Sequence, residues 1–533
     1  MYIISGNLFI INYNKKGIMN NLNKAIILLG LFLPSIAFGT NWTGTFILGS
    51  CCEPKTLDPA AMGISQTEGY VINSMYEGLT KYDSEGKIEP LLAEKWEISP
   101  DAKKYIFYIR KNVKFHDSTI LKANDVKKSI ERHMKLSMGN LGFILKPVEN
   151  IKILEDYKLE INLKESNFQF WSGLPHIKIL SSSAIEKNES GDLGKEYFRE
   201  NAVGTGPYKF LRWDKGRQTE LVAFEDYWKG WDGRHLNKFI ARYGLDYSSR
   251  LLLMEKGKLH LIDWAGLSDV RRAATNSNIT LNYGNPLQGF YHFMKQDGPL
   301  KDINVRKALL HAFPYEAMID VMQGFAVPLT SPAIGGTTGH CDVFEPKQNI
   351  DKAKMFLSKS NFKDGFKLKQ AYKYSNEPRR FAAILFQEAL AELNIEIELD
   401  DIPWGTFIGA QKNFDTAYDM SSHWLNIPIP YSGEMLYRLN HSSLINTGTG
   451  NWAWYKNQKF DDLLETAPTL APNDPKINKL LCDAQKLLID EAIVIPVMIS
   501  QYIDLTHSSV KGYKYDPYGF PGNLNLYNVY LSN

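Results

Sequence analysis

The residues that could do chemistry lack the spacing of a catalytic or metal site. The 11 histidines of the 533-residue chain are scattered, without the intervals that metal ligands show. The sequence contains no GxSxG nucleophile elbow, no HExxH zinc motif and no GK[ST] phosphate loop. Gly448-Thr-Gly450 followed by Ala453 fits the letters GxGxxA, but it leads into Trp-Ala-Trp-Tyr rather than into a helix. We therefore expect no enzyme, no cofactor and no metal, with a glycosidase as the alternative, because its two carboxylates need only meet in space.

Aromatic side chains are the second chemical feature of the chain. They make up 12% of the residues, including 28 Tyr and 11 Trp. Flat, amphipathic rings give a large contact area at a small entropy cost, so this surplus suits a ligand surface as well as a core. The charged fraction of 23% and the net charge of +2 are typical of a soluble globular protein. Because a polyanion partner normally requires a basic surplus, we expect no nucleic-acid binding.

The N-terminus carries the pattern of an export signal. Residues 25–38 (AIILLGLFLPSIAF) form an apolar run behind three lysines and lead into the small-residue pattern Ala-Phe-Gly. Fourteen residues with an internal proline are too few to cross a bilayer, but they match the core of a signal peptide. We expect a cleavable signal over residues 1–39, with Met1 or Met19 as the start, and a periplasmic location. A signal anchor is the alternative.

The four cysteines are Cys51, Cys52, Cys341 and Cys482, and they show no CxxC pair with metal-like spacing. An oxidising compartment would permit a disulfide between Cys341 and Cys482, which we expect to share a lobe. Two buried thiols are the alternative. Cys51 and Cys52 would alternate faces on a strand, which predicts one buried and one half-exposed thiol.

Strands and helices alternate along the chain. Period-2 patterns predict strands over residues 105–110 and 158–163, and helical spacing predicts a helix around 126–134. A further amphipathic helix over 381–393 runs directly into a strand over 395–399. This step from helix to strand is typical of α/β packing, and the length of the chain exceeds what one core supports.

Several short segments carry a resemblance when they are taken in order. They are EPKTLDP (53–59), YEGL (76–79), GKIEPLLAEKW (86–96), SPDA (99–102), FYIR (107–110), VKFHD (113–117), ANDV (123–126), GTGPY (204–208) with Trp213, DYW (226–228), VRKA (305–308) and GFA (324–326). Together they resemble the family 5 extracellular solute-binding proteins, the oligopeptide, dipeptide and nickel binders of ABC importers. Most of these residues suit a structural role. For example, Gly204 and Gly206 are expected to supply positive φ angles before Pro207 fixes the chain.

The resemblance implies an α/β fold, namely a two-lobed periplasmic binding protein (Venus-flytrap, class II-type) with an additional domain inserted in the first lobe. The expected parts are the signal (1–39), lobe I (40–80), the inserted domain (81–195), lobe I continued (196–292), lobe II (293–498) and a return to lobe I (499–533). The chain is expected to cross between lobes near residues 291–295 and 497–502. A ligand that contacts both lobes would stabilise the closed state.

The resemblance also places candidate ligand-binding residues in three stretches and at Trp404. They are Met62, Gly63, Ile64 and Ser65; His423, Trp424 and Asn426; and Trp452, Trp454 and Tyr455. In peptide-binding relatives the backbone of the first stretch pairs with an extended ligand. On a strand, Trp452 and Trp454 would face the same side. For each of these tryptophans, a position in the core is the alternative.

One position departs from the pattern of the peptide-binding members. Those proteins typically carry an aspartate three residues after the Trp of the second stretch, where it pairs with the ammonium group of the peptide. Counted from Trp424, this position is Ile427, with Asn426 beside it. An amide cannot neutralise an ammonium group, and a buried unpaired charge is costly. A modified peptide, a metallophore, a heme-like ligand or an oligosaccharide therefore stands beside a peptide as the expected cargo.

The function expected from the resemblance is the periplasmic substrate-binding component of an ABC importer. Its partners would be a peptide or peptide-like small ligand and the transporter permease in the inner membrane, which the protein would meet as a monomer. A secreted hydrolase, and a periplasmic chaperone that uses the same cleft, are the alternatives.

Overall fold

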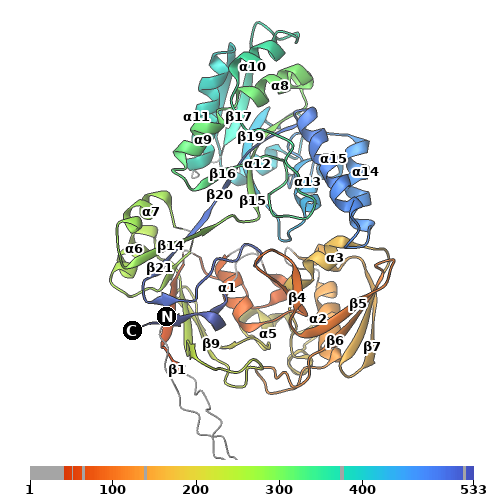
Figure 1. Ribbon diagram of the computed structural model, residues 1–533, viewed down its shortest axis with the longest axis vertical. Helices are drawn as coiled ribbons and strands as arrows, with labels where there is room; N and C mark the ends of the chain where they lie inside the picture. The colour runs from red at the N-terminus through yellow and green to blue at the C-terminus, as the bar shows by residue number, and fades with distance from the viewer. Residues whose placement is uncertain are drawn as a thin grey trace, which may run out of the picture. The chain divides into compact units, whose positions relative to one another are not determined.

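The computed structural model describes residues 41–50, 52–62, 66–136, 138, 141–263, 265–372, 377–519 and 524–532 (Figure 1). The expected signal segment, Cys51 and the candidate site residues Gly63, Ile64 and Ser65 lie outside these ranges. Within them, no helix is both long and apolar enough to cross a membrane.

A seven-stranded sheet forms the centre of the first lobe, which we call lobe I. Its strands, in spatial order, are β14 (Ile279–Gly284), β21 (Tyr502–His507), β13 (Leu261–Ile262), β2 (Thr45–Gly49), β12 (Lys238–Arg242), β10 (Gln218–Ala223) and β9 (Tyr208–Asp214). Its α-helices are α1 (Gln66–Met75), α5 (Lys195–Glu200), α6 (Tyr247–Glu255) and α7 (Leu267–Ala274), whereas α4 (Ser182–Lys187) packs against α2 (Ala123–Leu136). Strand β2 pairs in parallel with β12 and β13 and alternates in burial, so that Phe46 and Leu48 fill the core.

A four-stranded antiparallel sheet lies within the range expected for the inserted domain. Its strands, in spatial order, are β5 (Ala93–Ile98), β6 (Lys104–Ile109), β8 (Lys158–Leu163) and β7 (Val148–Glu155), with helices α2 (Ala123–Leu136) and α3 (Phe168–Gly173). Two of these strands and α2 confirm the periodicity read over 105–110, 158–163 and 126–134.

A six-stranded sheet forms the second lobe, lobe II. Its strands, in spatial order, are β16 (Ala326–Pro328), β20 (Val494–Ser500), β15 (Gln288–Met294), β19 (Met420–Asn426), β17 (Phe366–Tyr372) and β18 (Ile395–Asp401). One buried cluster packs it against α8 (Ile303–Ala312), α9 (Tyr315–Val321), α10 (Ile350–Leu357) and α11 (Glu377–Ala391). Another packs it against α12 (Trp404–Ala410), α13 (Ser432–Asn440), α14 (Gln458–Thr466) and α15 (Lys476–Asp490). The helix predicted over 381–393 and the strand predicted over 395–399 correspond to α11 and β18.

The chain passes between the two sheets at two short segments. Residues 285–287 join β14 to β15, and Gln501 joins β20 to β21. The side chain of Gln501 donates a hydrogen bond to Asn285 Oδ1 over 3.2 Å, so the two crossings contact each other. The expected second crossing, 497–502, includes Gln501. Residues 291–295, expected for the first crossing, instead lie largely in β15, because that apolar run is a central strand buried on both faces.

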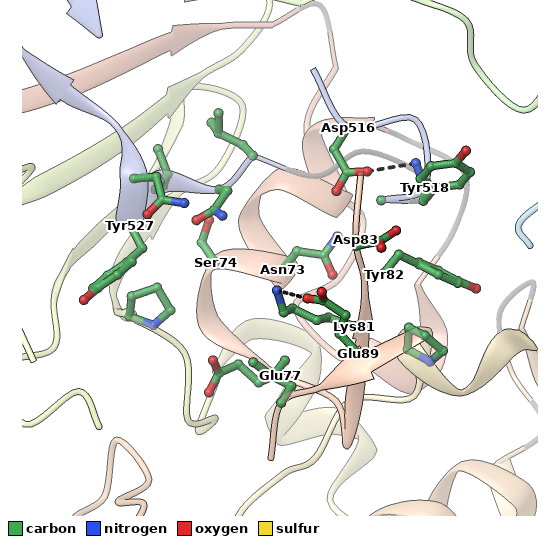
Figure 2. A pocket seen from close by; sticks show the side chains of 18 of the residues that line it. Asn73, Ser74, Glu77, Lys81, Tyr82, Asp83, Glu89, Asp516, Tyr518 and Tyr527 are labelled. Carbon is green, nitrogen blue, oxygen red and sulfur yellow. Dashed lines mark hydrogen bonds and ion pairs between the residues drawn. The ribbon is translucent and has the colours of Figure 1, made fainter. Parts of the chain in front are cut away.

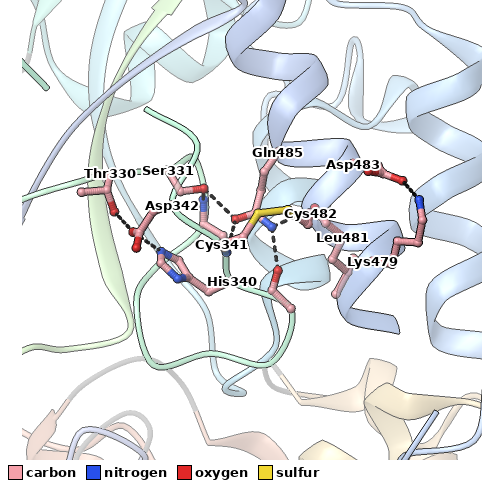
Figure 3. Close-up of a disulfide and its surroundings, with 12 residues drawn as sticks. Thr330, Ser331, His340, Cys341, Asp342, Lys479, Leu481, Cys482, Asp483 and Gln485 are labelled. Atoms are coloured by element: carbon pink, nitrogen blue, oxygen red, sulfur yellow. Dashed lines mark hydrogen bonds and ion pairs between the residues drawn. A yellow bond between two sulfur atoms is a disulfide. The ribbon is translucent and has the colours of Figure 1, made fainter. Parts of the chain in front are cut away.

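A disulfide fastens a long loop of lobe II to α15 (Figure 3). Cys341 and Cys482 are bonded, with their Cα atoms 5.6 Å apart, which confirms the disulfide interpretation over two free thiols. Beside the bond, Gln485 Oε1 accepts from Ser331 Oγ over 2.6 Å, and Gln485 Nε2 donates to Gly339 O over 2.7 Å. By contrast, Cys52 is a free thiol outside any strand, and it is exposed rather than buried or half-exposed as expected.

The two glycines of the GTGPY motif have a structural role, but a different one from the role expected. Gly204 and Gly206 do not have positive φ angles. A Cβ at either glycine would lie 2.2 Å or 2.6 Å from the nearest backbone atom of α1, at its C-terminal end. These glycines are therefore required for close backbone approach rather than for a left-handed turn.

Candidate ligand-binding site

Three of the predicted site residues meet in lobe II and form an aromatic cluster with two phenylalanines. Trp404 begins α12, His423 lies in β19, and Trp452 follows α13 in a loop. The ring centroids of His423 and Trp452 are 4.5 Å apart, and those of Trp404 and His423 are 5.3 Å apart. Phe407 and Phe293 complete the aromatic cluster, at 4.2 Å from His423 and 5.1 Å from Trp452 respectively. Side chains that are far apart in sequence thus converge at one place.

Trp404 is the member of the aromatic cluster that reaches the surface. Its side chain is 38% exposed, whereas Trp452 is 4% exposed and His423 is 1% exposed. Phe407 lies under Trp404, with the two rings nearly parallel at 25°. The indole is therefore held in place from below and offers its free surface to a ligand.

His423 is a neutral imidazole inside the aromatic cluster. Burial, and then the nearby Arg379, hold the pKa of His423 well below its ordinary value. Among the described residues, neither of its ring nitrogens has a hydrogen-bond partner. A neutral ring can donate one hydrogen bond and accept one, so His423 can serve a polar group without adding a charge.

Arg379, which was not predicted, brings a positive charge to the aromatic cluster. It lies in the first turn of α11, is 8% exposed, and its guanidinium carbon is 5.5 Å from the ring centroid of Trp404. Burial lowers the pKa of Arg379 to about 10, so the guanidinium stays protonated at neutral pH. A sequence signal exists: Arg379 precedes the buried Ala382, Ala383 and Phe386 by three, four and seven residues, which puts a charge on the apolar face of the helix.

Trp424 and Asn426 lie outside the aromatic cluster. Side chains alternate along β19, so Trp424 points to the opposite face from His423, where its ring centroid is 4.6 Å from that of Phe290. It packs against the core formed by α8 to α11. Asn426 ends β19 opposite Gln288 and is half-buried. Ile427, at the position of the family's aspartate, is fully buried, and its N–H donates to Leu287 O over 2.9 Å.

The third stretch is a turn and not the expected strand. The side chain of Asn451 accepts from the N–H of Tyr455 over 2.9 Å and donates to Tyr455 O over 2.8 Å, which closes the turn. Trp454 has a positive φ of 57°, and its ring contacts Phe414 at 5.1 Å instead of following Trp452 into the aromatic cluster. Tyr455 is buried against Phe460. The shared face predicted for Trp452 and Trp454 is therefore wrong.

Of the first predicted stretch, the structure describes Met62. Its side chain is 1% exposed and packs in the core of lobe I. Among the described residues, no group of His, Cys, Asp and Glu side chains has the arrangement of a metal site.

Comparisons with known proteins test the family that the sequence motifs suggest. The family model of the bacterial extracellular solute-binding proteins, family 5 (middle region), matches residues 87–446. The dipeptide-binding protein DppE of Bacillus subtilis (strain 168) is 26% identical over 503 residues, covering 88% of this chain and 89% of the relative. Heme-binding protein A of Haemophilus influenzae is 26% identical over 513 residues, covering 89% and 91%.

A solved structure shows the same fold. HbpA2 from Haemophilus parasuis superposes with a TM-score of 0.81 at 23% identity, covering 92% of this chain and 100% of that one. Its likeness confirms the two-lobed α/β architecture expected from the sequence motifs. Since the family model spans well over half of the chain, this protein belongs to the bacterial extracellular solute-binding proteins, family 5.

Proposed function

We propose that this protein is the periplasmic capture subunit of an ABC importer and that it holds a peptide or peptide-like ligand by a carboxylate of the ligand. The observation that carries the proposal is the protonated Arg379 above Trp404, at the edge of the aromatic cluster. Membership of the family and the export pattern of residues 25–38 support the importer role and the periplasmic location. The permease of the importer would be its membrane partner.

The charges at the site favour a carboxylate over an ammonium group. Arg379 is cationic, His423 is neutral, and the remaining members of the aromatic cluster are apolar rings or indoles. At the position where peptide-binding relatives typically hold an ammonium group, this chain has the buried, apolar Ile427. A carboxylate can form two parallel hydrogen bonds with a guanidinium, and such charge-assisted bonds are stronger than bonds between neutral groups. We therefore propose that a peptide binds here by its C-terminal end.

The body of the ligand would lie on the exposed indole. Trp404 supplies a rigid ring surface that accepts many side chains, because stacking needs no specific hydrogen bond. His423 can add one polar contact to a backbone amide of the ligand. The crossings at residues 285–287 and at Gln501 supply the hinge for closure, which a ligand in contact with both lobes would stabilise. We propose that the ligand leaves unchanged and that the protein catalyses no reaction.

A heme-like or metallophore ligand is the second candidate, and the same observation favours it. Such molecules carry carboxylates that would suit Arg379 and flat surfaces that would suit Trp404. One relative is named a heme-binding protein, whereas another is named a dipeptide-binding protein. Both candidates would thus be held by a carboxylate on Arg379, and this distinguishes them from a ligand that is held by its amino terminus.

Chemical capping of a peptide tests the proposal. We would first identify a bound peptide by native mass spectrometry of the protein purified from its own periplasm. Calorimetry would then compare that peptide with its C-terminal amide and with its N-acetyl form. Amidation should weaken binding on the order of tenfold or more, because it removes a charge-assisted bond, whereas N-acetylation should change affinity little. The opposite order would contradict the proposal.

A matched pair of variants locates the effect. Arg379→Gln should remove the preference for a free carboxylate. Arg380→Gln should keep it, because Arg380 is the exposed neighbour on the same helix turn. Equal behaviour of the two variants would show that the anchor lies elsewhere.

A further inference from the structure

A pocket between lobe I and the range expected for the inserted domain shares no residue with the aromatic cluster (Figure 2). Its volume is about 720 Å³, within the range of small-molecule sites. The C-terminal part of α1, the hairpin of β3 (Thr80–Tyr82) and β4 (Ile88–Pro90), and the 3-10 helix η3 (Leu174–His176) line one part of it. The rest of the wall consists of residues 514–519 and 524–528, which follow the return of the chain to lobe I.

Tyrosine rings form much of the wall of this pocket. The ring centroids of Tyr82 and Tyr518 are 5.8 Å apart, and those of Tyr227 and Tyr527 are 5.2 Å apart. The hydroxyl of Tyr82 donates to the carbonyl of Ser172, which fixes the ring. The pocket therefore presents flat, mostly apolar surfaces to an occupant.

Lys178 brings an incompletely satisfied ammonium group to the pocket. Among the described residues, the one hydrogen bond that its Nζ donates goes to Pro175 O over 3.2 Å, although an ammonium group has three N–H donors. Burial, partly offset by Glu77 and Asp516, lowers the pKa of Lys178 to about 8, so it remains mostly charged at neutral pH. The ammonium group thus keeps donors for an acceptor on a ligand.

Glu77 already has its own partners, so it does not use these donors. Its Oε1 accepts from Tyr227 over 2.8 Å, and its Oε2 accepts from Thr205 over 3.0 Å and from Trp228 over 2.8 Å. All three donors are neutral. The carboxylate is therefore held in place by the scaffold, and it is not within ion-pair distance of Lys178 in the described residues.

Thr80 is a second unsatisfied group on the same wall. Its side chain is fully buried, it lines the pocket, and its hydroxyl has no hydrogen-bond partner among the described residues. It lies two residues after Gly78, which pairs with Lys178 in an isolated β-bridge. A buried hydroxyl without a partner is costly, so Thr80 also favours an acceptor on an occupant of the pocket.

We propose that this pocket is a second ligand site, which takes a small carboxylate with an aromatic or apolar body. The carboxylate accepts from Lys178 Nζ and Thr80 Oγ1, and the body packs against the rings of Tyr82 and Tyr518. None of the residues that line this pocket belongs to the aromatic cluster, so the two sites are distinct sets of side chains.

Two probe molecules of the same shape test the charge requirement. Calorimetry on the mature protein would use 3-phenylpropionate and its uncharged amide. We expect the carboxylate to bind on the order of tenfold more tightly than the amide, since charge-assisted hydrogen bonds are the stronger kind. Equal binding of the two, or no binding of the carboxylate, would overturn the proposal.

Variants decide whether the carboxylate binds in this pocket or at the cargo site. Lys178→Met keeps the apolar stem and should weaken 3-phenylpropionate by tenfold or more, and Thr80→Val should weaken it by a smaller factor. Lys103→Met, at an exposed lysine of the turn before β6, should have no effect. Arg379→Gln should leave this binding intact, so the two proposals can fail separately. Loss of 3-phenylpropionate binding in Arg379→Gln, with binding retained in Lys178→Met, would refute the second site. If Lys178→Met fails to fold, the affinity of Thr80→Val for 3-phenylpropionate decides instead.

Discussion

Asp58, the aspartate of the EPKTLDP motif, forms a buried ion pair whose removal should destabilise the fold without affecting the ligand site. Its two oxygens accept from the two terminal nitrogens of Arg132, on α2, over 2.8 Å and 2.6 Å. The side chains are 1% and 2% exposed. Oδ1 also accepts from the N–H of Ala60, and Arg132 Nε donates to Leu193 O over 2.7 Å. The pair therefore links the first segment of lobe I to the range expected for the inserted domain.

The size of the effect follows from burial. Asp58→Asn keeps an oxygen for the N–H of Ala60 but leaves the guanidinium of Arg132 buried without a counter-charge. Removing one partner of a buried ion pair costs about 3–5 kcal/mol. Replacing both residues, in Asp58→Asn with Arg132→Met, should cost less than the sum of the single changes, because no unpaired charge remains.

Urea denaturation measures the free energy of unfolding, and calorimetry measures the affinity of the folded protein. The control is Asp156→Asn, which breaks an exposed pair with Lys122 and should change stability little. We expect Asp58→Asn to unfold at lower urea and still to bind its ligand normally. Normal stability with lost binding would refute the reasoning, because it would mean that the motif contacts the ligand.

Three further predictions concern the lobes, the disulfide and pH. Gln169 of α3 donates to Glu434 of α13 over 3.0 Å, so Gln169→Ala should weaken ligand affinity a few fold, by destabilising the contact of these helices, with unchanged stoichiometry in calorimetry. Cys341→Ser opens a bond between residues 141 positions apart and should lower the free energy of unfolding by about 2–5 kcal/mol in urea denaturation. Burial holds the pKa of His176 and of His292 at about 3 in the folded protein, against about 6.5 when unfolded. The unfolded chain therefore takes up more protons as the pH falls below about 7, and the urea midpoint should drop toward pH 4; a midpoint that rises would contradict this.

The elements of the fold could largely be predicted from local pattern. Strand β8 coincides with the period-2 run at 158–163, and the step from α11 to β18 follows from helical spacing that changes to alternation. These signals arise within one element, so a single sequence contains them. The first crossing lies a few residues before the predicted position. An apolar run alone does not show whether it joins two sheets or lies at the centre of one.

The candidate site could be predicted only in part, because it depends on register between distant strands. His423 and Trp424 are neighbours, yet the pairing of β19 with β15 and β17 sends only His423 into the aromatic cluster. Arg379 joins it from another helix, and no local pattern states what an arginine on an apolar face will contact. The turn at Trp452 was missed because the side chain of Asn451 imposes it, overriding the apparent alternation.

The central claim is that a carboxylate of the cargo is held at Arg379, and cargo retention tests it most directly. Native mass spectrometry would compare the unaltered protein, Arg379→Gln and Arg380→Gln, each purified from its own periplasm under the same conditions. We predict a retained carboxylate-bearing ligand on the unaltered protein and on Arg380→Gln, and its loss from Arg379→Gln. Full retention by Arg379→Gln, or a cargo without a carboxylate, would contradict the account.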